Sequence, residues 1–313
     1  MSYPPHIVSY VVPAYNCESY IRKAIESAFS QTYSPMEIIL SDDCSSDRTY
    51  ELMQQMARDY HGQHKIVLNR NPENLGITKH MNRLFLELAH GDIIVVAHGD
   101  DVSEANRADV LVNYLNSHPE CMQVASSAIV CDSHLKPLAE CHQRKIQVSE
   151  ERVYHFSSGA HVTIPFSAFR KKVMEFFGPL NDDCPTEDDP VGFRAIMLGS
   201  IALLPDLLVR YRKHEGSMSN PEKFIQFPLD KIFEQQVKDM SLAVSNGLIT
   251  VEEADTTKDN LHKGMLQRKV YRNYFAKRTL SSLYPLLSYP GISWRRRLAY
   301  LREHLEYLLW GAS

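Results

Sequence analysis

The chain has 313 residues, of which 44% are hydrophobic and 23% are charged, a composition typical of a globular protein and not of a disordered or fibrous one. The sequence has no run of the roughly 20 apolar residues that span a bilayer and no signal peptide at its N-terminus. Its six cysteines form neither a CxxC pair nor a Cys/His zinc spacing. We therefore expect reduced thiols in a cytoplasmic protein.

The net charge of −4 conceals an uneven distribution of charge along the chain. Of the 34 basic residues, ten lie between Leu261 and Arg302, where there is no Asp or Glu. This end of the chain is therefore predicted to have a different neighbour from the acidic remainder.

Strand-like and helix-like patterns alternate along the first hundred residues. Short apolar runs predict strands at 7–12, 36–40, 65–69 and 93–97, the first of them broken by Pro13. Apolar residues at helical spacing predict a helix after each of the first three strands, with Asn16 capping the first and Ser46 and Asp47 opening the second. This alternation predicts an α/β fold with a mostly parallel, layered sheet.

Two of the predicted strands end in paired carboxylates. Asp42 and Asp43 follow the second strand, and Asp100 and Asp101 follow the fourth. The carboxyl ends of parallel strands share one edge, where α/β proteins bind ligands, so both pairs are expected to face one crevice. Such carboxylates suit a divalent cation, although either pair alone could be a solvated turn. GxGxxG and P-loop motifs are absent, which disfavours dinucleotide dehydrogenases and P-loop enzymes.

Several segments, taken in order, resemble family-2 glycosyltransferases. They are VVPAYNCESYIRKAIESAFSQTYSPMEIILSDDCSSDRT, NLGITKHMN, GDIIVVAHGDD, FSAFRKKVMEFFGPL and TEDDPVGFRAIMLGSIALLPDLLVRYRKHEGSMS. The resemblance covers about Ile7 to Ser219 and implies a GT-A nucleotide-diphospho-sugar transferase fold. It implies a catalytic domain at 1–220, with a nucleotide-sugar donor half at 1–102 and an acceptor half at 103–220. Residues 221–313 would then form a helical, basic C-terminal region.

The resemblance also implies which residues bind the donor. Asp101, with Asp100, would bind Mn²⁺ or Mg²⁺, and Asp43, beside Asp42, would accept a hydrogen bond from the base. His98 replaces the first Asp of the usual DxD region; it is either a weak metal ligand or, as we favour, a polar residue beside the nucleotide. The other donor-site candidates are Pro13, Ala14, Tyr15, Lys79, Arg212 and His214.

The acidic segment TEDD supplies candidate general bases, because transfer requires a group that takes the proton of the acceptor hydroxyl. The resemblance points to Asp188, with Glu187 beside it. Two carboxylates about 5 Å apart repel by roughly 3 kcal/mol at a dielectric of about 20, which raises one pKa by about two units. Two alternatives stay open: an acidic run that only favours a helix N-terminus, and an assignment shifted by one residue onto Asp189.

Two further segments carry residues that suit this site. The resemblance implies that the YRxHxxSxS segment, Tyr211 to Ser219, closes over the diphosphate, with a surface turn as the alternative. Arg170 and Lys171 are candidates for the acceptor or diphosphate side, with a solvated helix start as an equal alternative.

The sequence therefore predicts an inverting, metal-dependent glycosyltransferase. It would move a sugar from a nucleotide sugar, expected to be a UDP-sugar, to a saccharide or lipid-linked saccharide acceptor in surface polysaccharide biosynthesis. One alternative is a nucleotidyltransferase acting on sugar phosphates, but PAYNCES lacks the glycines of its phosphate loop. A non-catalytic nucleotide-sugar-binding scaffold is the other, supported by His98 and opposed by Asp188. Nucleic acid is not an expected partner.

The C-terminal segment predicts amphipathic helices. SWRRRLAYLREHLEYLLW places five apolar residues on one helix face, and a second helix near Leu261 to Phe275 carries much of the basic charge. Both helices could pack on the catalytic domain or pair in a homodimer. The charge asymmetry favours peripheral attachment to the anionic inner face of a membrane, where each basic residue contributes about 1 kcal/mol.

Overall fold

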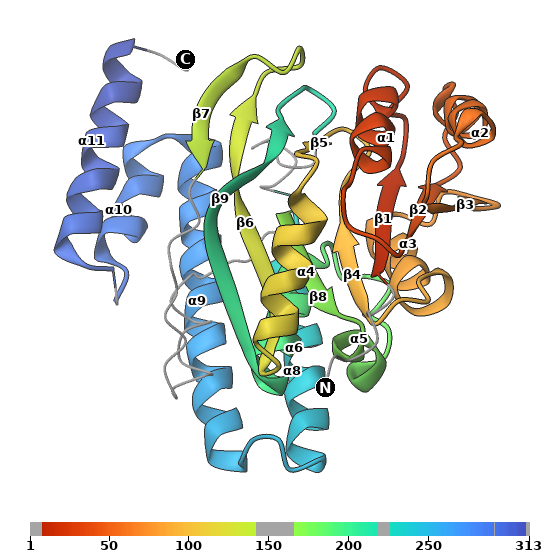
Figure 1. Ribbon diagram of the computed structural model, residues 1–313. Coiled ribbons are helices and arrows are strands. Elements are labelled where there is room, and N and C mark those ends of the chain that lie inside the picture. The colour runs from red at the N-terminus through yellow and green to blue at the C-terminus, as the bar shows by residue number, and fades with distance from the viewer. Residues whose placement is uncertain (1–7, 142–165, 218–225, 291, 311–313) are drawn as a thin grey trace.

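The computed structural model describes residues 8–141, 166–217, 226–290 and 292–310, so Ser219 lies outside the described residues. Within these ranges nine strands form one sheet, in the order β3-β2-β1-β4-β8-β6-β9-β5, with β7 paired to β6. Helices cover both faces of this sheet (Figure 1). The predicted layered α/β architecture is confirmed.

The first four strands are parallel to one another and form the part of the sheet ordered β3-β2-β1-β4. They are β1 (Val8–Ala14), β2 (Met36–Asp42), β3 (Lys65–Arg70) and β4 (Ile93–Val96). The intervening helices are α1 (Ile21–Phe29), α2 (Thr49–Asp59) and α3 (Ile77–Arg83), which continues as the π-helical η1 (Leu84–Leu88). Because strand side chains alternate between faces, Tyr10 packs with α1 and α2 while Val11 packs with α3 and η1.

Two local predictions in this half were wrong. β1 runs through Pro13 to Ala14, because Pro13 keeps its register with Ser41 and its carbonyl accepts a hydrogen bond from the Gly99 N–H (2.9 Å). Asn16 does not cap α1, which begins at Ile21. It adopts φ 50°, and its Oδ1 accepts the Ser46 N–H (2.9 Å), so it ties the loop after β1 to the loop after β2.

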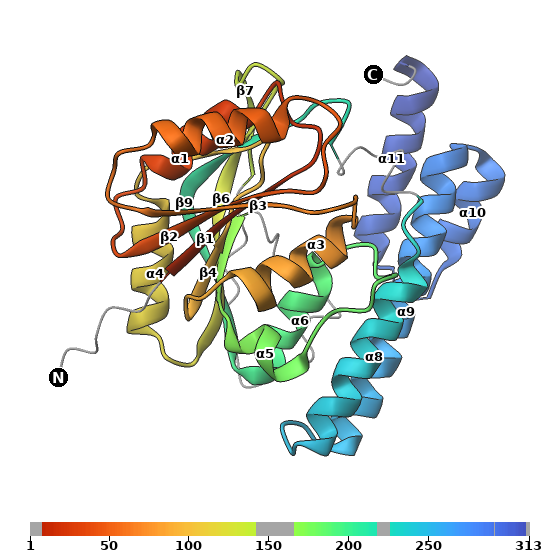
Figure 2. The ribbon, with the colours of Figure 1, turned by 90° about the vertical axis from the view of Figure 1, so that its right-hand side faces the viewer.

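The part of the chain from residue 102 to residue 212 adds mixed strand pairing. Its elements are β5 (Val102–Ser103), α4 (Arg107–Ser117), β6 (Cys121–Cys131), β7 (Pro137–Cys141), β8 (Ser167–Arg170), α5 (Lys172–Phe177), α6 (Asp188–Leu198) and β9 (Ser200–Arg212). β8 is antiparallel to both β4 and β6, whereas β6 and β9 are parallel. α5 and α6 lie on the α3 side of the sheet, opposite α1 and α2 (Figure 2). The long β9 pairs with β5 and so reaches the segment that follows β4.

The C-terminal region is helical: α8 (Leu229–Ser245), α9 (Val251–Lys277), α10 (Leu280–Ser288) and α11 (Trp294–Trp310). α8 and α9 lie side by side along α6 (Figure 2), and Met240 of α8 and Leu261 of α9 belong to the same core cluster as Val96 of β4. α10 and α11 lie beyond α9 and form a separate small core with it. The boundary near residue 220 stays a prediction.

None of the helices in the described part of the chain combines the length and the apolar character needed to cross a membrane.

Candidate functional site

The ends of β1 and β4 meet at the carboxyl edge of the sheet. The turn after β4 approaches β1 so closely that a Cβ on Gly99 would lie 2.7 Å from the Cβ of Ala14 and 3.2 Å from the Pro13 carbonyl oxygen. Only glycine permits this approach. It brings Pro13 and Ala14 against the turn that carries Asp100 and Asp101, while Tyr15 is about half exposed beside it.

Asp100 and Asp101 form a largely buried acidic pair. Asp101 Oδ1 accepts the Arg212 N–H (2.7 Å), and Asp101 Oδ2 is buried without a hydrogen-bond partner. Asp100 Oδ2 lies 3.1 Å from His214 Nε2. Burial and the charge of Asp100 raise the pKa of Asp101 well above its ordinary value. Burial also opposes ionisation of Asp100, but the His214 hydrogen bond and the His98 charge outweigh it and lower the pKa of Asp100.

The segment that follows β9 is fixed to this acidic pair. Arg212 Nε donates to the Asp100 carbonyl (2.7 Å) and Nη1 to the Ser133 carbonyl (2.6 Å). The Arg212 guanidinium lies 4.7 Å from the centroid of the Tyr20 ring, and the His214 ring lies 4.5 Å from it. Arg212 and His214, which are predicted site residues, therefore lie beside the acidic pair. Tyr20 and Ser133 have no distinguishing sequence pattern and were not predicted.

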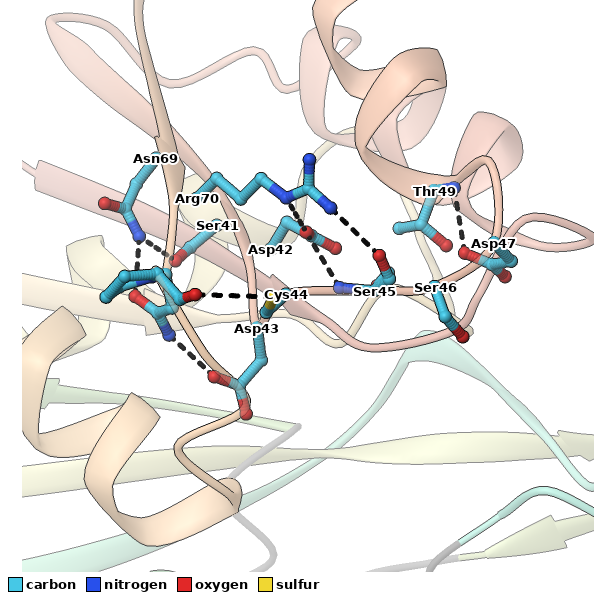
Figure 3. A network of polar contacts seen from close by, with 12 residues as sticks. Ser41, Asp42, Asp43, Cys44, Ser45, Ser46, Asp47, Thr49, Asn69 and Arg70 are labelled. Atoms are coloured by element: carbon cyan, nitrogen blue, oxygen red, sulfur yellow. Dashed lines mark hydrogen bonds and ion pairs between the residues drawn. The ribbon is translucent and has the colours of Figure 1, made fainter.

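Asp42 and Asp43 bind different parts of the chain (Figure 3). Asp42 is fully buried; its Oδ2 accepts the Ser45 N–H (3.0 Å) and lies 3.3 Å from Arg70 Nε. Asp42 thus stabilises the loop after β2 through Ser45 and pairs with Arg70 of β3.

Asp43 binds the turn that precedes α3. Its Oδ1 accepts bonds from Asn71 Nδ2 (2.7 Å) and the Leu75 N–H (3.0 Å), and its Oδ2 accepts the Gly76 N–H (3.0 Å). A carboxylate oxygen accepts two hydrogen bonds, so Asp43 Oδ2 retains capacity for one more donor. Lys79, in the first turn of α3, lies at the surface with its Nζ 3.2 Å from Asp182 Oδ2.

The N-terminal end of α6, which we call its head, lies close to His98 in the turn after β4. Glu187 is 3% exposed, and burial raises its pKa from 4.5 to about 7. His98 Nε2 is 3.9 Å from Glu187 Oε1, beyond hydrogen-bonding distance, and has no hydrogen-bond partner. Burial lowers the pKa of His98 and outweighs the charges of Asp100 and Asp188, which act to raise it. Asp188 is partly buried in the first turn of α6.

Asp189, the third acid of the segment TEDD, binds one of the C-terminal helices. Asp189 Oδ2 accepts a hydrogen bond from Arg268 Nη1 of α9 at 2.8 Å. This ion pair distinguishes Asp189 from Glu187 and Asp188, which lie near His98.

Arg170 and Lys171, two further candidates, bind main-chain carbonyls and not the acidic pair. Arg170 donates to the carbonyls of Cys121 (2.9 Å) and Leu115 (2.7 Å), and Lys171 donates to the Ala89 carbonyl (2.8 Å). Both cations thus stabilise helix C-termini, at the ends of α4 and η1.

One further buried cation lies behind the acidic pair and was not predicted. Arg107 is fully buried at the start of α4 and donates to the Val96 carbonyl (2.6 Å) and to Ser103 Oγ (2.9 Å). Its charge opposes the rise in the pKa of Asp101. Arg107 lies six residues after Asp101, but no sequence pattern marked it as part of this site.

The family model described as glycosyl transferase family 2 matches residues 9–177, which is more than half of the chain. The chain belongs to this family. EpsE of Bacillus subtilis, named as a glycosyltransferase, is 34% identical over 125 residues, covering 40% of this chain and 44% of EpsE. The glycosyltransferase GlyG of Streptococcus pneumoniae is 26% identical over 253 residues, covering 76% of this chain and 81% of GlyG.

The chain spans less than two thirds of several of its curated relatives, with 44% of EpsE and 59% of a Mycobacterium tuberculosis protein covered. Solved structures share its fold over nearly its whole length. Staphylococcus aureus TarS 1–349 in complex with UDP-GlcNAc has a TM-score of 0.56 at 17% identity, covering 97% of this chain and 92% of TarS 1–349. The mannosyltransferase PcManGT of Pyrobaculum calidifontis, in complex with GDP-Man and Mn²⁺, has a TM-score of 0.56 at 19% identity, covering 98% of this chain and 88% of PcManGT. The predicted family and GT-A fold are confirmed.

Proposed function

We propose that this protein transfers a sugar, with inversion, from a UDP-sugar to a saccharide or lipid-linked saccharide in surface polysaccharide biosynthesis, and that it requires Mn²⁺ or Mg²⁺. The observation that carries the proposal is the meeting of Asp100, Asp101, Arg212 and His214 with the acidic head of α6 at one edge of the sheet. The nucleotide sugars in the TarS and PcManGT structures support a donor of this class.

The acidic pair suits a hard divalent cation. Asp101 Oδ2 is a buried oxygen acceptor without a partner, which a cation would satisfy. In the described residues no cluster of three or more His, Cys, Asp or Glu is preassembled for a metal. This is compatible with Mg²⁺-type binding, in which one or two carboxylates are joined by substrate phosphates and waters. We assign Asp101 and Asp100 as the ligands; when bound, the cation would offset the negative charge of the leaving diphosphate.

The remaining donor contacts follow from position and chemistry. Asp43 Oδ2 has capacity for a base N–H, and Pro13, Ala14 and Tyr15 line the adjacent edge. Arg212 Nη2 is buried and has no hydrogen-bond partner. We assign it, together with His214, as a donor to the diphosphate, where a charge-assisted bond is stronger than a neutral one.

We assign Asp188 as the base that removes the acceptor proton. It is partly exposed at the head of α6, near His98, whereas Asp189 is bound by Arg268. We assign the buried Glu187 beside it as a second acidic residue of the catalytic site. One base and one displacement at the anomeric carbon invert its configuration.

The test is a panel of nucleotide sugars assayed for donor hydrolysis and transfer, with Mn²⁺, with Mg²⁺ and with a chelator. We expect one donor to be turned over only with metal. Turnover that is unchanged by the chelator would reject the metal requirement. Metal-independent UDP binding in calorimetry, with no turnover of any donor, would instead favour a scaffold.

A further inference from the structure

A continuous apolar stripe of α11 is exposed at the surface of the protein. Its members are Trp294 (66% exposed), Leu298 (55%), Leu301 (38%), Leu305 (57%) and Leu308 (62%). They recur at alternating intervals of four and three residues, so they lie on one side of the helix. The other side is anchored, since Tyr300 and His304 are buried against Tyr271 and Tyr274 of α9. α11 is therefore held in place with its apolar stripe exposed to solvent.

The ten cations between Leu261 and Arg302 divide into two groups by the exposure of their side chains. Five are buried or half-buried and bind within the protein: Arg268 to Asp189, Lys269 to Asp230, Arg272 to the Phe227 carbonyl, Arg278 to Glu303, and Arg297 to the carbonyls of Ile292 and Tyr289. The charge of these five therefore stabilises the packing of the protein itself. The other five have exposed side chains: Lys263, Lys277, Arg295, Arg296 and Arg302.

The spacing of the stripe fits either a membrane surface or a second copy of the helix, and the residues on the flank of the stripe decide between the two. A four-three spacing also suits a seam between two copies of a helix. Arg295 and Arg302, however, each follow a stripe residue by one position, which places both on the same flank of the stripe. In a symmetric pair of helices these cations would border the seam, where paired helices normally place opposite charges. The equivalent positions of α11 hold no acidic residue, so the cations of the two copies would repel each other.

We infer that the exposed face of α11 binds an anionic membrane surface. Trp294 and the leucines would enter the interfacial layer, while Arg295 and Arg302 contact lipid phosphates; amphipathic helices with this composition lie in the plane of the interface, and Trp favours that depth. The inference is independent of the proposed sugar transfer, because it concerns a surface outside the catalytic edge of the sheet.

The test is co-sedimentation of the full chain with vesicles of phosphatidylcholine alone or mixed with phosphatidylglycerol, at low and high salt. We expect binding to the anionic vesicles that weakens at high salt. Arg295→Gln with Arg302→Gln should weaken partitioning about 30-fold, and Leu298→Gln with Leu305→Gln on the order of 100-fold. Matched controls at exposed sites elsewhere, Arg22→Gln with Arg58→Gln and Leu138→Gln with Leu248→Gln, should bind like the wild type.

Folding and assembly are measured in parallel. The stripe residues are exposed, so the variants should keep the wild-type thermal unfolding midpoint. Wild-type protein that stays in the supernatant with anionic vesicles at low salt would overturn the inference, as would stripe variants that sediment like the wild type. A wild-type dimer in light scattering that becomes monomeric in the Leu298→Gln, Leu305→Gln variant would also overturn it, because the stripe would then be a seam between copies.

Discussion

Replacing Glu187 with Gln is expected to stabilise the protein at neutral and alkaline pH. Burial raises the pKa of this carboxyl from 4.5 to about 7, so the folded state binds its proton more tightly than the unfolded chain. The contribution of Glu187 to stability is therefore fully present below pH 4.5 and is lost as the pH rises through about 7. The two pKa values correspond to about 3 kcal/mol in the free energy of unfolding. Gln preserves the shape of the neutral form and does not ionise.

The measurement is urea unfolding of both proteins between about pH 5 and pH 8.5, plotted as the difference in unfolding free energy. His98, Asp188 and Cys184 are other ionisable residues near this carboxyl, but they are present in both proteins. The difference should grow by about 2.5 kcal/mol in favour of Glu187→Gln between pH 5 and pH 8.5, since the first part of the effect is already present at pH 5. Glu73→Gln, at an exposed position, should give a flat difference. A flat curve for Glu187→Gln as well, within about 0.5 kcal/mol, would refute the reasoning from burial.

Three further outcomes test the site. Asp101→Asn should weaken metal-dependent UDP binding in calorimetry at least about tenfold, and unchanged binding would contradict its assignment as a ligand. Asp188→Asn should lower kcat by roughly 10²–10⁴ and leave nucleotide affinity unchanged, whereas Asp189→Asn should keep most turnover and lose about 1–3 kcal/mol of stability through its bond to Arg268; the opposite kinetic pattern would place the base one residue later. An α-linked donor should give a β-linked product by NMR, and retention of configuration would exclude a single displacement.

Sequence periodicity was sufficient to predict the first four strands of the fold. The runs 36–40 and 93–97 are apolar and bounded by polar turns, and they form parallel strands, β2 and β4, on either side of β1. The prediction that both acidic pairs follow strands of one sheet depended only on this alternation. The ends of individual elements were less predictable: Pro13 stays in β1 because Gly99 supplies a hydrogen bond to its carbonyl, a contact between residues far apart in the sequence.

The roles of neighbouring acids could not be separated from the sequence. Asp42 and Asp43 are adjacent, yet one binds Arg70 and Ser45 behind the loop while the other binds the turn before α3. Successive residues of an extended chain point in opposite directions, but which direction faces the ligand depends on tertiary contacts. The role of Asp189 could not be predicted either, because its partner, Arg268, lies on α9.

The basic charge of the C-terminal region shows why a count of residues cannot replace geometry. Five of the cations between Leu261 and Arg302 are buried or half-buried and bind within the protein, and Arg268 does so at the head of α6. The body of α6 is bound too: Arg194 Nε lies 2.8 Å from Asp239 Oδ2 of α8, with both side chains fully or nearly fully buried. Breaking such a pair leaves an uncompensated charge, at a cost of roughly 3–5 kcal/mol. We therefore expect α8 and α9 to unfold together with the sheet and α6.

This packing links the two proposals. α6 carries Glu187 and Asp188 at its head, α9 holds that head through Arg268, and α11 is anchored on the same α9 through Tyr300 and His304. An α11 bound at a membrane would fix the distance between the lipid surface and Asp188. An acceptor anchored in that membrane would then reach the base by diffusion in two dimensions, and truncation of α11 should raise KM for a lipid-linked acceptor while leaving KM for a water-soluble acceptor unchanged. An equal rise for both acceptors would show that α11 acts on the catalytic fold and not on the delivery of the acceptor.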